Sequence, residues 1–348
     1  MKKWMSLLLA AALALALLSG CAPKGETKEM VLFSWADTFP QEVLDAFTAE
    51  TGIKVVYTYF ESNEEMLTKL EAAKGGDYDV VMASDYIVDI ARKEGLMQKL
   101  DKSVITRYGD IEPAMLNQFY DPDNEYCVPY EAGTPLIIYD PAKVDFEIKG
   151  YNDLWNPALE DSVVIIDDAR VITGITLLSM GYTMNETEES IIRAAGDKLI
   201  TLKPNIRVFD YSAPHEKMIS GEAAVGFMFT SQIVWALSER PDLKVVYPEE
   251  GMGYGIDSCF IPSNAPNPEY ANLFLNFILD GKISAQISEF TQYINCVTTA
   301  KEYLSPEYLN NEALYIPGEI LGDAQFIMDV GPDATALYDE VWTAMKQS

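Results

Sequence analysis

The chain has few of the residues on which most metal and catalytic sites depend. Among 348 residues there is one histidine, His215, and there are four cysteines. A histidine-based metal cluster is therefore excluded, and a histidine general base would have to be His215, which stands at a predicted helix start. Cys127, Cys259 and Cys296 show no C-x-x-C spacing, so buried structural thiols are the simplest interpretation, while one internal disulfide stays open.

Enzyme and cofactor motifs are missing as well. No G-x-S-x-G, H-E-x-x-H or Walker sequence is present. Gly251 to Gly255 has two glycines of a dinucleotide fingerprint but does not open a helix, and Asp121 to Glu125 resembles a calcium loop only at its start. We therefore predict a protein that is not an enzyme, with no catalytic residue, no cofactor and no metal.

Positive charge is scarce. The chain carries 25 basic and 54 acidic residues, a formal net charge of −29. Nucleic acid and a direct contact with an anionic membrane surface are disfavoured, because a polyanion would be repelled over most approaches. A cationic ligand would be attracted, although a high negative charge also serves solubility alone.

A long apolar run occurs at the N-terminus only. Lys2 and Lys3 precede the run from Met5 to Leu18, and Leu18-Ser19-Gly20-Cys21 follows. A membrane span needs about 20 apolar residues, and this run stops sooner. The layout resembles a bacterial lipoprotein signal, with residues 1–20 removed and Cys21 lipidated. Residues 21–29 then form a tether, and the protein is anchored to a membrane on its extracytoplasmic side, in the periplasm or on the outer face of the plasma membrane.

Short apolar runs rich in β-branched residues alternate with segments of helical period. The predicted strands are Met30 to Phe33, Ile53 to Tyr59, Asp79 to Ala83, Val163 to Ile166, Ala224 to Phe229 and Lys244 to Tyr247. This alternation predicts an α/β fold with mixed, largely parallel sheets. The length allows two domains. Proline-containing stretches near residues 128–135 and 247–255 are expected to cross between two lobes, made of residues 30–130 plus 256–300 and residues 131–255 plus 301–348.

Aromatic and acidic residues gather where the predicted strands end. In open α/β sheets, ligands bind outside the carboxyl ends of the strands. The candidate residues there are Trp35, Asp37, Ser84, Asp85, Tyr86, Asp168 and Phe229, with Tyr254 and Asp257 near the second crossing. An aromatic face attracts an ammonium by roughly 0.5–2 kcal/mol, and a carboxylate accepts charge-assisted hydrogen bonds from it. Each residue also has a purely structural interpretation, as core or as a helix N-cap.

Several of these stretches together resemble one known family. They are Phe33-Ser34-Trp35-Ala36-Asp37, Glu50 to Val55, Tyr59 to Glu64, Ser84-Asp85-Tyr86, Arg92 to Gly95, Asp167 to Arg170 and Asp257-Ser258. In order and spacing, the chain resembles the spermidine/putrescine-binding proteins of bacterial ABC importers over nearly all of its mature length. The resemblance implies a monomer with a two-lobed, type II periplasmic-binding fold and a hinge between the lobes. It also implies a polyamine ligand and delivery to membrane permease subunits.

The resemblance assigns roles to individual residues. Trp35 and Tyr86 match aromatic-wall positions, Ser84 matches a polar contact, and Asp168 and Asp257 match amine-binding carboxylates. Asp37 matches an acidic position, and Tyr293 matches a late tyrosine of the site.

The chain also departs from the family pattern. Val171 stands where a glutamate is usual, Phe229 and Gly255 where tryptophan is common, and Thr38 where a tyrosine is expected. Loss of a carboxylate and of aromatic area would favour a shorter diamine or a different cation.

Three alternatives stay open at this point. The same two-lobed receptor could bind another amine, an amino-acid derivative, a sugar or a metal. An anchored hydrolase could use the carboxylates of Asp167 and Asp168, although neighbouring residues usually point apart. An adhesin or sensor could dock a protein partner instead of a small ligand.

Overall fold

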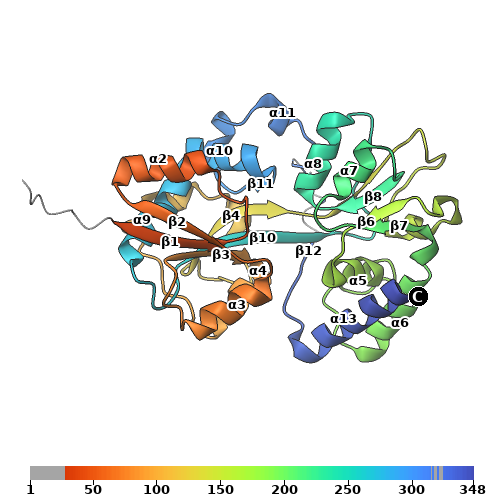
Figure 1. The fold of residues 1–348 in the computed structure, drawn as a ribbon, viewed down its shortest axis with the longest axis horizontal. Helices are drawn as coiled ribbons and strands as arrows, with labels where there is room; N and C mark the ends of the chain where they lie inside the picture. The colour runs from red at the N-terminus through yellow and green to blue at the C-terminus, as the bar shows by residue number, and fades with distance from the viewer. Residues whose placement is uncertain (1–27, 315, 317–319, 321–323) are drawn as a thin grey trace, which may run out of the picture.

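The computed structural model describes residues 28–314, 316, 320 and 324–348, which form two α/β lobes placed end to end (Figure 1). The predicted signal peptide, Cys21 and most of the tether lie outside the described residues. Glu29, predicted as the last residue of the tether, already opens the first strand.

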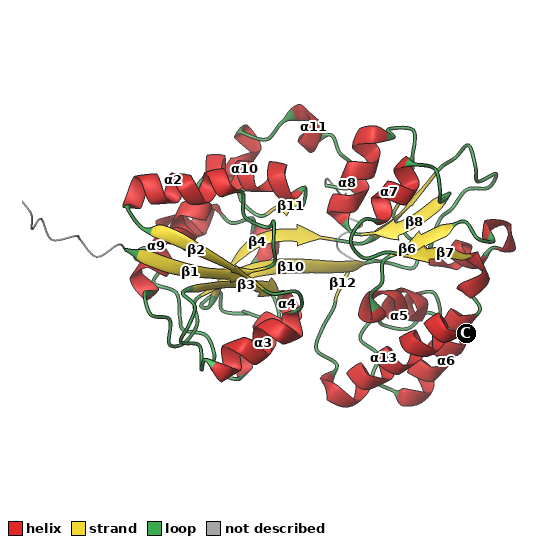
Figure 2. Cartoon of the chain, in the orientation of Figure 1, coloured by secondary structure: helices red, strands yellow, loops and turns green. Residues whose placement is uncertain are grey.

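The strands follow the predicted ones closely and add others that the sequence pattern did not single out (Figure 2). The strands are β1 (Glu29–Ser34), β2 (Lys54–Tyr59), β3 (Val80–Ser84), β4 (Cys127–Gly133), β5 (Leu136–Tyr139), β6 (Val163–Ile165), β7 (Ile206–Phe209), β8 (Val225–Met228), β9 (Lys244–Val246), β10 (Gly253–Phe260), β11 (Ile294–Asn295) and β12 (Gln325–Phe326).

Helices cover both faces of the two sheets (Figure 2). The α-helices are α2 (Gln41–Thr51), α3 (Asn63–Ala72), α4 (Asp85–Lys93), α5 (Ala169–Leu178), α6 (Glu189–Ile200), α7 (Pro214–Ile219), α8 (Thr230–Glu239), α9 (Pro268–Ile278), α10 (Gly281–Thr291), α11 (Pro306–Leu309) and α13 (Gly331–Gln347). Short 3-10 helices span Thr106–Asp110, Pro113–Met115, Tyr151–Trp155, Pro157–Leu159, Lys203–Asn205 and Thr298–Glu302.

Each lobe is built on one sheet with parallel and antiparallel neighbours. The first sheet has the order β11-β4-β10-β3-β1-β2, with β12 paired to β10, and its β3, β1 and β2 are parallel. The second has the order β7-β6-β8-β5-β9, in which β7, β6 and β8 are parallel. The prediction of an α/β fold with mixed sheets is therefore confirmed.

Local sequence signals explain the helices that follow β1 and β2. Helix α2 buries Val43, Leu44 and Phe47, and it ends at Gly52, whose φ of 72° favours glycine. Ser62 caps α3, because its side chain accepts a hydrogen bond from the backbone N–H of Glu65. These devices fix the positions of the loops after β1 and β2.

Two crossings join the lobes where proline-containing segments were expected. The chain leaves β4 at Gly133 and enters β5 at Leu136, and it returns between β9 and β10. The hydroxyl of Thr134 in the first crossing donates to the carbonyl of Gly253 in the second, and the Thr134 backbone N–H donates at 2.9 Å to Oγ1 of Thr230, the first residue of α8. The crossings thus lie side by side and are held together by buried hydrogen bonds.

The chain crosses between the lobes a third time, in a segment that the sequence pattern did not single out. The 3-10 helix Thr298–Glu302 still packs against α10 of the first lobe, and the Ser305 backbone donates to Glu289 of the same helix. The chain then pairs β12 with β10 before α13 packs on α5 and α6 of the second lobe (Figure 1). The C-terminal helix therefore completes the second lobe.

Across the described ranges, helices fall short of the length and apolar character that crossing a bilayer requires. Cys127, Cys259 and Cys296 are buried free thiols.

A single buried carboxylate joins three elements of the first lobe. Asp79 is fully buried, and it accepts hydrogen bonds from the backbone N–H groups of Val31 at 2.7 Å and Asn267 at 2.6 Å. We expect Asp79→Asn to lower the free energy of unfolding by about 1–3 kcal/mol, since an amide would place a donor against donors. Urea denaturation measures this change, with Asp77→Asn, at an exposed position, as the matched control. Equal midpoints for the two variants would contradict it.

Candidate ligand-binding site

The first lobe brings a row of polar side chains together across three neighbouring strands. Asp257 of β10 pairs with Ser84 of β3 on one side and with Glu131 of β4 on the other. Directly opposed residues of adjacent strands present their side chains on the same face of a sheet. Ser84, Asp257 and Glu131 therefore form one row close to the crossings.

Burial disfavours the charged form of the Asp257 side chain. Burial raises its pKa to about 6, while a hydrogen bond with the Ser84 side chain lowers it. Desolvation disfavours the charged form of a carboxyl group. A cation placed beside Asp257 would restore the charged form, so this position is suited to an ammonium group.

Asp85 differs from the other predicted carboxylates because both of its oxygens bind backbone N–H groups. It is buried, and its two oxygens accept hydrogen bonds from the backbone N–H groups of Tyr86 at 2.7 Å and Ile256 at 3.2 Å. Burial, followed by the charge of Asp257, raises the pKa of Asp85 well above its usual range. Asp85 joins the start of α4 to β10 next to Asp257.

Trp35 stands in the turn after β1 and is held by a network that the sequence did not reveal. Its ring meets Phe60 edge-on at 4.7 Å between centroids. Its carbonyl accepts hydrogen bonds from the hydroxyls of Thr38 and Tyr57, and the Thr38 hydroxyl lies 2.8 Å from that of Tyr57. Tyr57 thus supports this turn from β2, while Thr38 occupies the position where the family pattern has a tyrosine.

Tyr86 is held within the first lobe by an acidic side chain. Its hydroxyl donates to Glu64 of α3 at 2.9 Å. Burial raises the pKa of Tyr86 most, and the charges of Glu64 and Asp168 raise it further. Because Asp168 belongs to the second lobe, Tyr86 lies within electrostatic reach of a carboxyl group of the other lobe.

The second lobe contributes residues at the N-termini of two helices. Asp168 caps α5 by accepting a hydrogen bond from the Val171 backbone at 2.8 Å, and burial raises its pKa. Phe229 directly precedes α8, and its ring lies 5.9 Å from that of Tyr211. Burial, then Asp168 and Asp257, raises the pKa of Tyr211 to about 12. Tyr211 therefore lies within electrostatic reach of carboxylates from both lobes.

Tyr293 lies against the first crossing. A Cβ added to Gly133 would lie 2.8 Å from the Tyr293 ring, so this close approach requires glycine. Burial raises the pKa of Tyr293, a hydrogen bond with Ser231 of the second lobe lowers it, and Glu131 and Asp257 raise it again. Tyr293 is thus placed beside the polar row and at the hinge.

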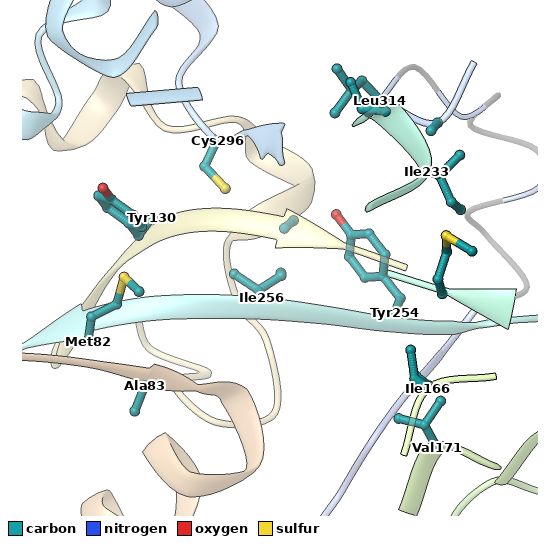
Figure 3. Packing of buried hydrophobic residues seen from close by; sticks show 14 of the residues in the cluster. Met82, Ala83, Tyr130, Ile166, Val171, Ile233, Tyr254, Ile256, Cys296 and Leu314 are labelled. Carbon is teal, nitrogen blue, oxygen red and sulfur yellow. The ribbon is translucent and has the colours of Figure 1, made fainter. Parts of the chain in front are cut away.

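Two predicted residues are not brought into this group. Asp37 is exposed in the turn after Trp35, with a left-handed φ of 58°. Tyr254 donates to Met115 Sδ and packs against Phe326. Figure 3 shows Tyr254 and Ile256 on the same side of β10, and strand alternation places Asp257 on the other side.

The carboxylates of Asp167 and Asp168 have separate partners. Asp167 accepts hydrogen bonds from Trp342 at 3.0 Å and from Lys346 at 2.8 Å, both on α13. Asp168 instead caps α5. This arrangement does not place the pair on either side of one substrate bond.

The remaining polar candidates lie elsewhere. The His215 and Trp235 rings meet at a tilt of 59° with 5.1 Å between centroids, on the α7–α8 side of the second lobe. Hollows of about 400 and 520 Å³ open on the surface, one lined by residues such as Tyr139 and Tyr247 and the other by residues such as Val43 and Phe290. Neither includes the row of Ser84, Asp257 and Glu131. Over the part of the chain that the structure describes, clusters of potential metal-ligating side chains are absent.

Comparison with known proteins places the chain in a family. The family model for bacterial extracellular solute-binding proteins matches residues 42–315. The chain belongs to this family. It is 38% identical over 347 residues, 99% of both chains, to the spermidine/putrescine-binding periplasmic protein of Salmonella typhimurium, and 37% identical with the same coverage to that of Escherichia coli K12.

A solved structure agrees with this placement. The spermidine/putrescine ABC transporter substrate-binding protein PotD from Streptococcus pneumoniae superposes with a TM-score of 0.82 at 31% identity, covering 92% of this chain and 99% of that one. The resemblance stated from the sequence is therefore confirmed, and so is a two-lobed binding-protein fold. Members of this family bind and transport solutes.

The buried acid predicts how stability depends on pH. The pKa of Asp257 is raised from 3.8 to about 6, so the folded protein holds this proton more tightly than the unfolded chain does. This difference in proton binding stabilises the folded protein fully below pH 4, and the contribution is lost as the pH rises through about 6. We expect Asp257→Asn to exceed the wild type in free energy of unfolding by about 1–3 kcal/mol at pH 7.5, with a smaller gap at pH 4.5. Urea denaturation of the ligand-free protein at both pH values tests this. A gap that is the same at both would show that Asp257 does not titrate in this way.

Proposed function

We propose that this protein is an extracytoplasmic receptor that captures putrescine or spermidine between its two lobes and delivers it to the permease subunits of an ABC importer. The observation that carries the proposal is the set of aromatic and acidic side chains contributed by both lobes. The first lobe provides Trp35, Tyr86 and Asp257, and the second provides Asp168 and Phe229. The names of the full-length relatives support the same ligand class.

The chemistry of a polyamine fits this set. Each ammonium group has three N–H donors and requires carboxylate or hydroxyl acceptors once it leaves water. The methylene chain between the ammonium groups is apolar and flexible, so it gains from contact with aromatic faces on both sides. Two carboxylates on different lobes, Asp168 and Asp257, would hold the two ends of such a molecule.

Contacts from both lobes also give the transport signal. A ligand stabilises the closed form only by the extra affinity that it has for that form, and half a site on each lobe provides this difference. The crossings at Thr134 and between β9 and β10 are the proposed hinge. The permease would then distinguish the loaded receptor by the relative position of the lobes.

Calorimetric titration tests the ligand. The full-length chain, purified in a mild detergent, is titrated with putrescine, cadaverine, spermidine and spermine, and we expect saturable one-to-one binding of at least one of them. Asp257→Asn should weaken that binding at least tenfold, because a hydrogen bond to a charged group contributes about 1.5–3 kcal/mol. Asp145→Asn, an exposed change, is the control. No heat with any of the four amines would reject the polyamine assignment.

The anchor is a separate proposal with its own test. We expect the protein expressed in a bacterial host to incorporate labelled palmitate and to partition into the detergent phase on Triton X-114 separation. Cys21→Ala should abolish both, because a thioether-linked diacylglycerol requires the cysteine sulfur. Label retained in Cys21→Ala would assign the lipid to another residue.

A further inference from the structure

Glu131 is a buried acid without a basic partner. Its side chain lies in β4 and is 2% exposed. Its Oε2 atom is buried and lacks, among the described residues, a partner at hydrogen-bonding geometry. The Thr291 hydroxyl on α10 lies near enough to lower the pKa of Glu131 but does not complete that bond. A buried carboxyl oxygen without a donor is costly, so its presence needs a reason.

The surroundings of Glu131 are acidic and polar rather than basic. Burial raises its pKa well above its usual range, the charge of Asp257 raises it further, and Thr291 lowers it. Other titratable groups whose pKa values respond to the charge of Glu131 are Tyr130, Cys259, Tyr293 and Cys296. All of these are acids when they titrate, so the described groups that sense the charge of Glu131 include no cation.

The strand register places Glu131 beside Asp257. The two residues are direct partners across β4 and β10, and opposed residues of antiparallel strands have Cβ atoms about 4.5–5.5 Å apart. Ser84 extends the row on the far side of Asp257. Two carboxyl groups therefore share one small region of the first lobe, next to the crossings.

In the second lobe, an apolar residue stands at the position where the family pattern has a further acid. Val171 is 4% exposed and offers only its backbone N–H, which Asp168 already accepts. The second lobe thus brings one carboxylate from this helix start, and the first lobe brings two.

We propose that Glu131 is a second carboxylate of the ammonium subsite at Asp257, so that one primary ammonium of the ligand is held between these two acids. The proposal rests on the proposed function, because it assigns the acceptors for one end of the same amine. The ammonium supplies the donor that Glu131 Oε2 lacks.

The same arrangement makes binding depend on pH. Two neighbouring buried acids share protons when no cation is present. An ammonium between them stabilises both as carboxylates, so its binding releases protons to the solvent and its affinity rises with pH. The aliphatic amine itself stays protonated in this range, because its ordinary pKa is near that of lysine, about 10.

The test compares Glu131→Gln with the wild type in the full-length chain, using putrescine as the probe. Calorimetry at pH 6.0 and pH 8.0, in two buffers of different ionisation enthalpy, gives both the affinity and the number of protons released. We expect Glu131→Gln to weaken putrescine binding at least tenfold at pH 8.0 and to release fewer protons. Its thermal midpoint without ligand should equal or exceed that of the wild type. Glu160→Gln, at an exposed position of the second lobe, should match the wild type in all three measurements.

The outcomes separate this proposal from the proposed function. If the wild type binds putrescine and Glu131→Gln binds it with unchanged affinity and proton release, Glu131 is a structural residue and the receptor assignment stands. If the wild type binds none of the four polyamines, both proposals fail. Glu131→Met, which has similar length and no charge, provides the same comparison if the glutamine variant does not fold.

Discussion

The site depends on one electrostatic constraint, which is that carboxyl groups are buried at the junction of the lobes without basic side chains to neutralise them. Asp85, Asp257 and Glu131 all have raised pKa values, and burial is the first cause in each case. Basic residues in the described chain form their ion pairs elsewhere, mostly at exposed positions such as Lys54 with Glu29. In the unliganded fold, burial therefore favours the protonated form of these carboxyl groups, and a bound cation would favour their charged form.

The fold maintains this region through backbone hydrogen bonds instead of cations. Asp85 accepts two backbone N–H groups, and Asp168 caps α5. Asp79, in the first lobe, likewise accepts hydrogen bonds from backbone N–H groups of β1 and of the residue that precedes α9. With both oxygens engaged by backbone N–H groups, Asp79 and Asp85 are structural parts of the scaffold. Asp168, which caps α5 through Oδ1, keeps acceptor capacity for a ligand, as do Asp257 and Glu131.

The sequence predicted those features that follow from local pattern. The strands that begin with Met30, Asp79 and Val163 were found within two residues, because short apolar runs flanked by turns and helix signals identify buried parallel strands. Trp35, Ser84 and Asp168 could then be predicted as site residues from the position of strand ends alone. The resemblance to a family added Tyr293, which no local pattern identifies.

Residues whose role depends on long-range pairing could not be found in the same way. Glu131 lies inside the run Val128-Pro129-Tyr130-Glu131-Ala132, and only the pairing of β4 with β10, and the packing of α10 over that face, makes it a buried neighbour of Asp257. Tyr57 similarly reaches Trp35 across the sheet from β2. Tyr254 lies three residues before Asp257 in β10, and strand alternation points these two side chains to opposite faces of the sheet.

The third crossing is hydrogen-bonded both to the second crossing and to the second lobe. The Gln325 backbone donates to Met252 beside β10, while its side chain accepts from Thr183 and Met184 of the second lobe. Three residues later, the Met328 backbone donates a hydrogen bond to the Asn185 side chain and accepts one from the Arg170 side chain, both in the second lobe. The segment around β12 therefore fastens the start of β10, at Gly253 and Tyr254, to the loop that carries Thr183, Met184 and Asn185, so the third crossing lies directly against the second.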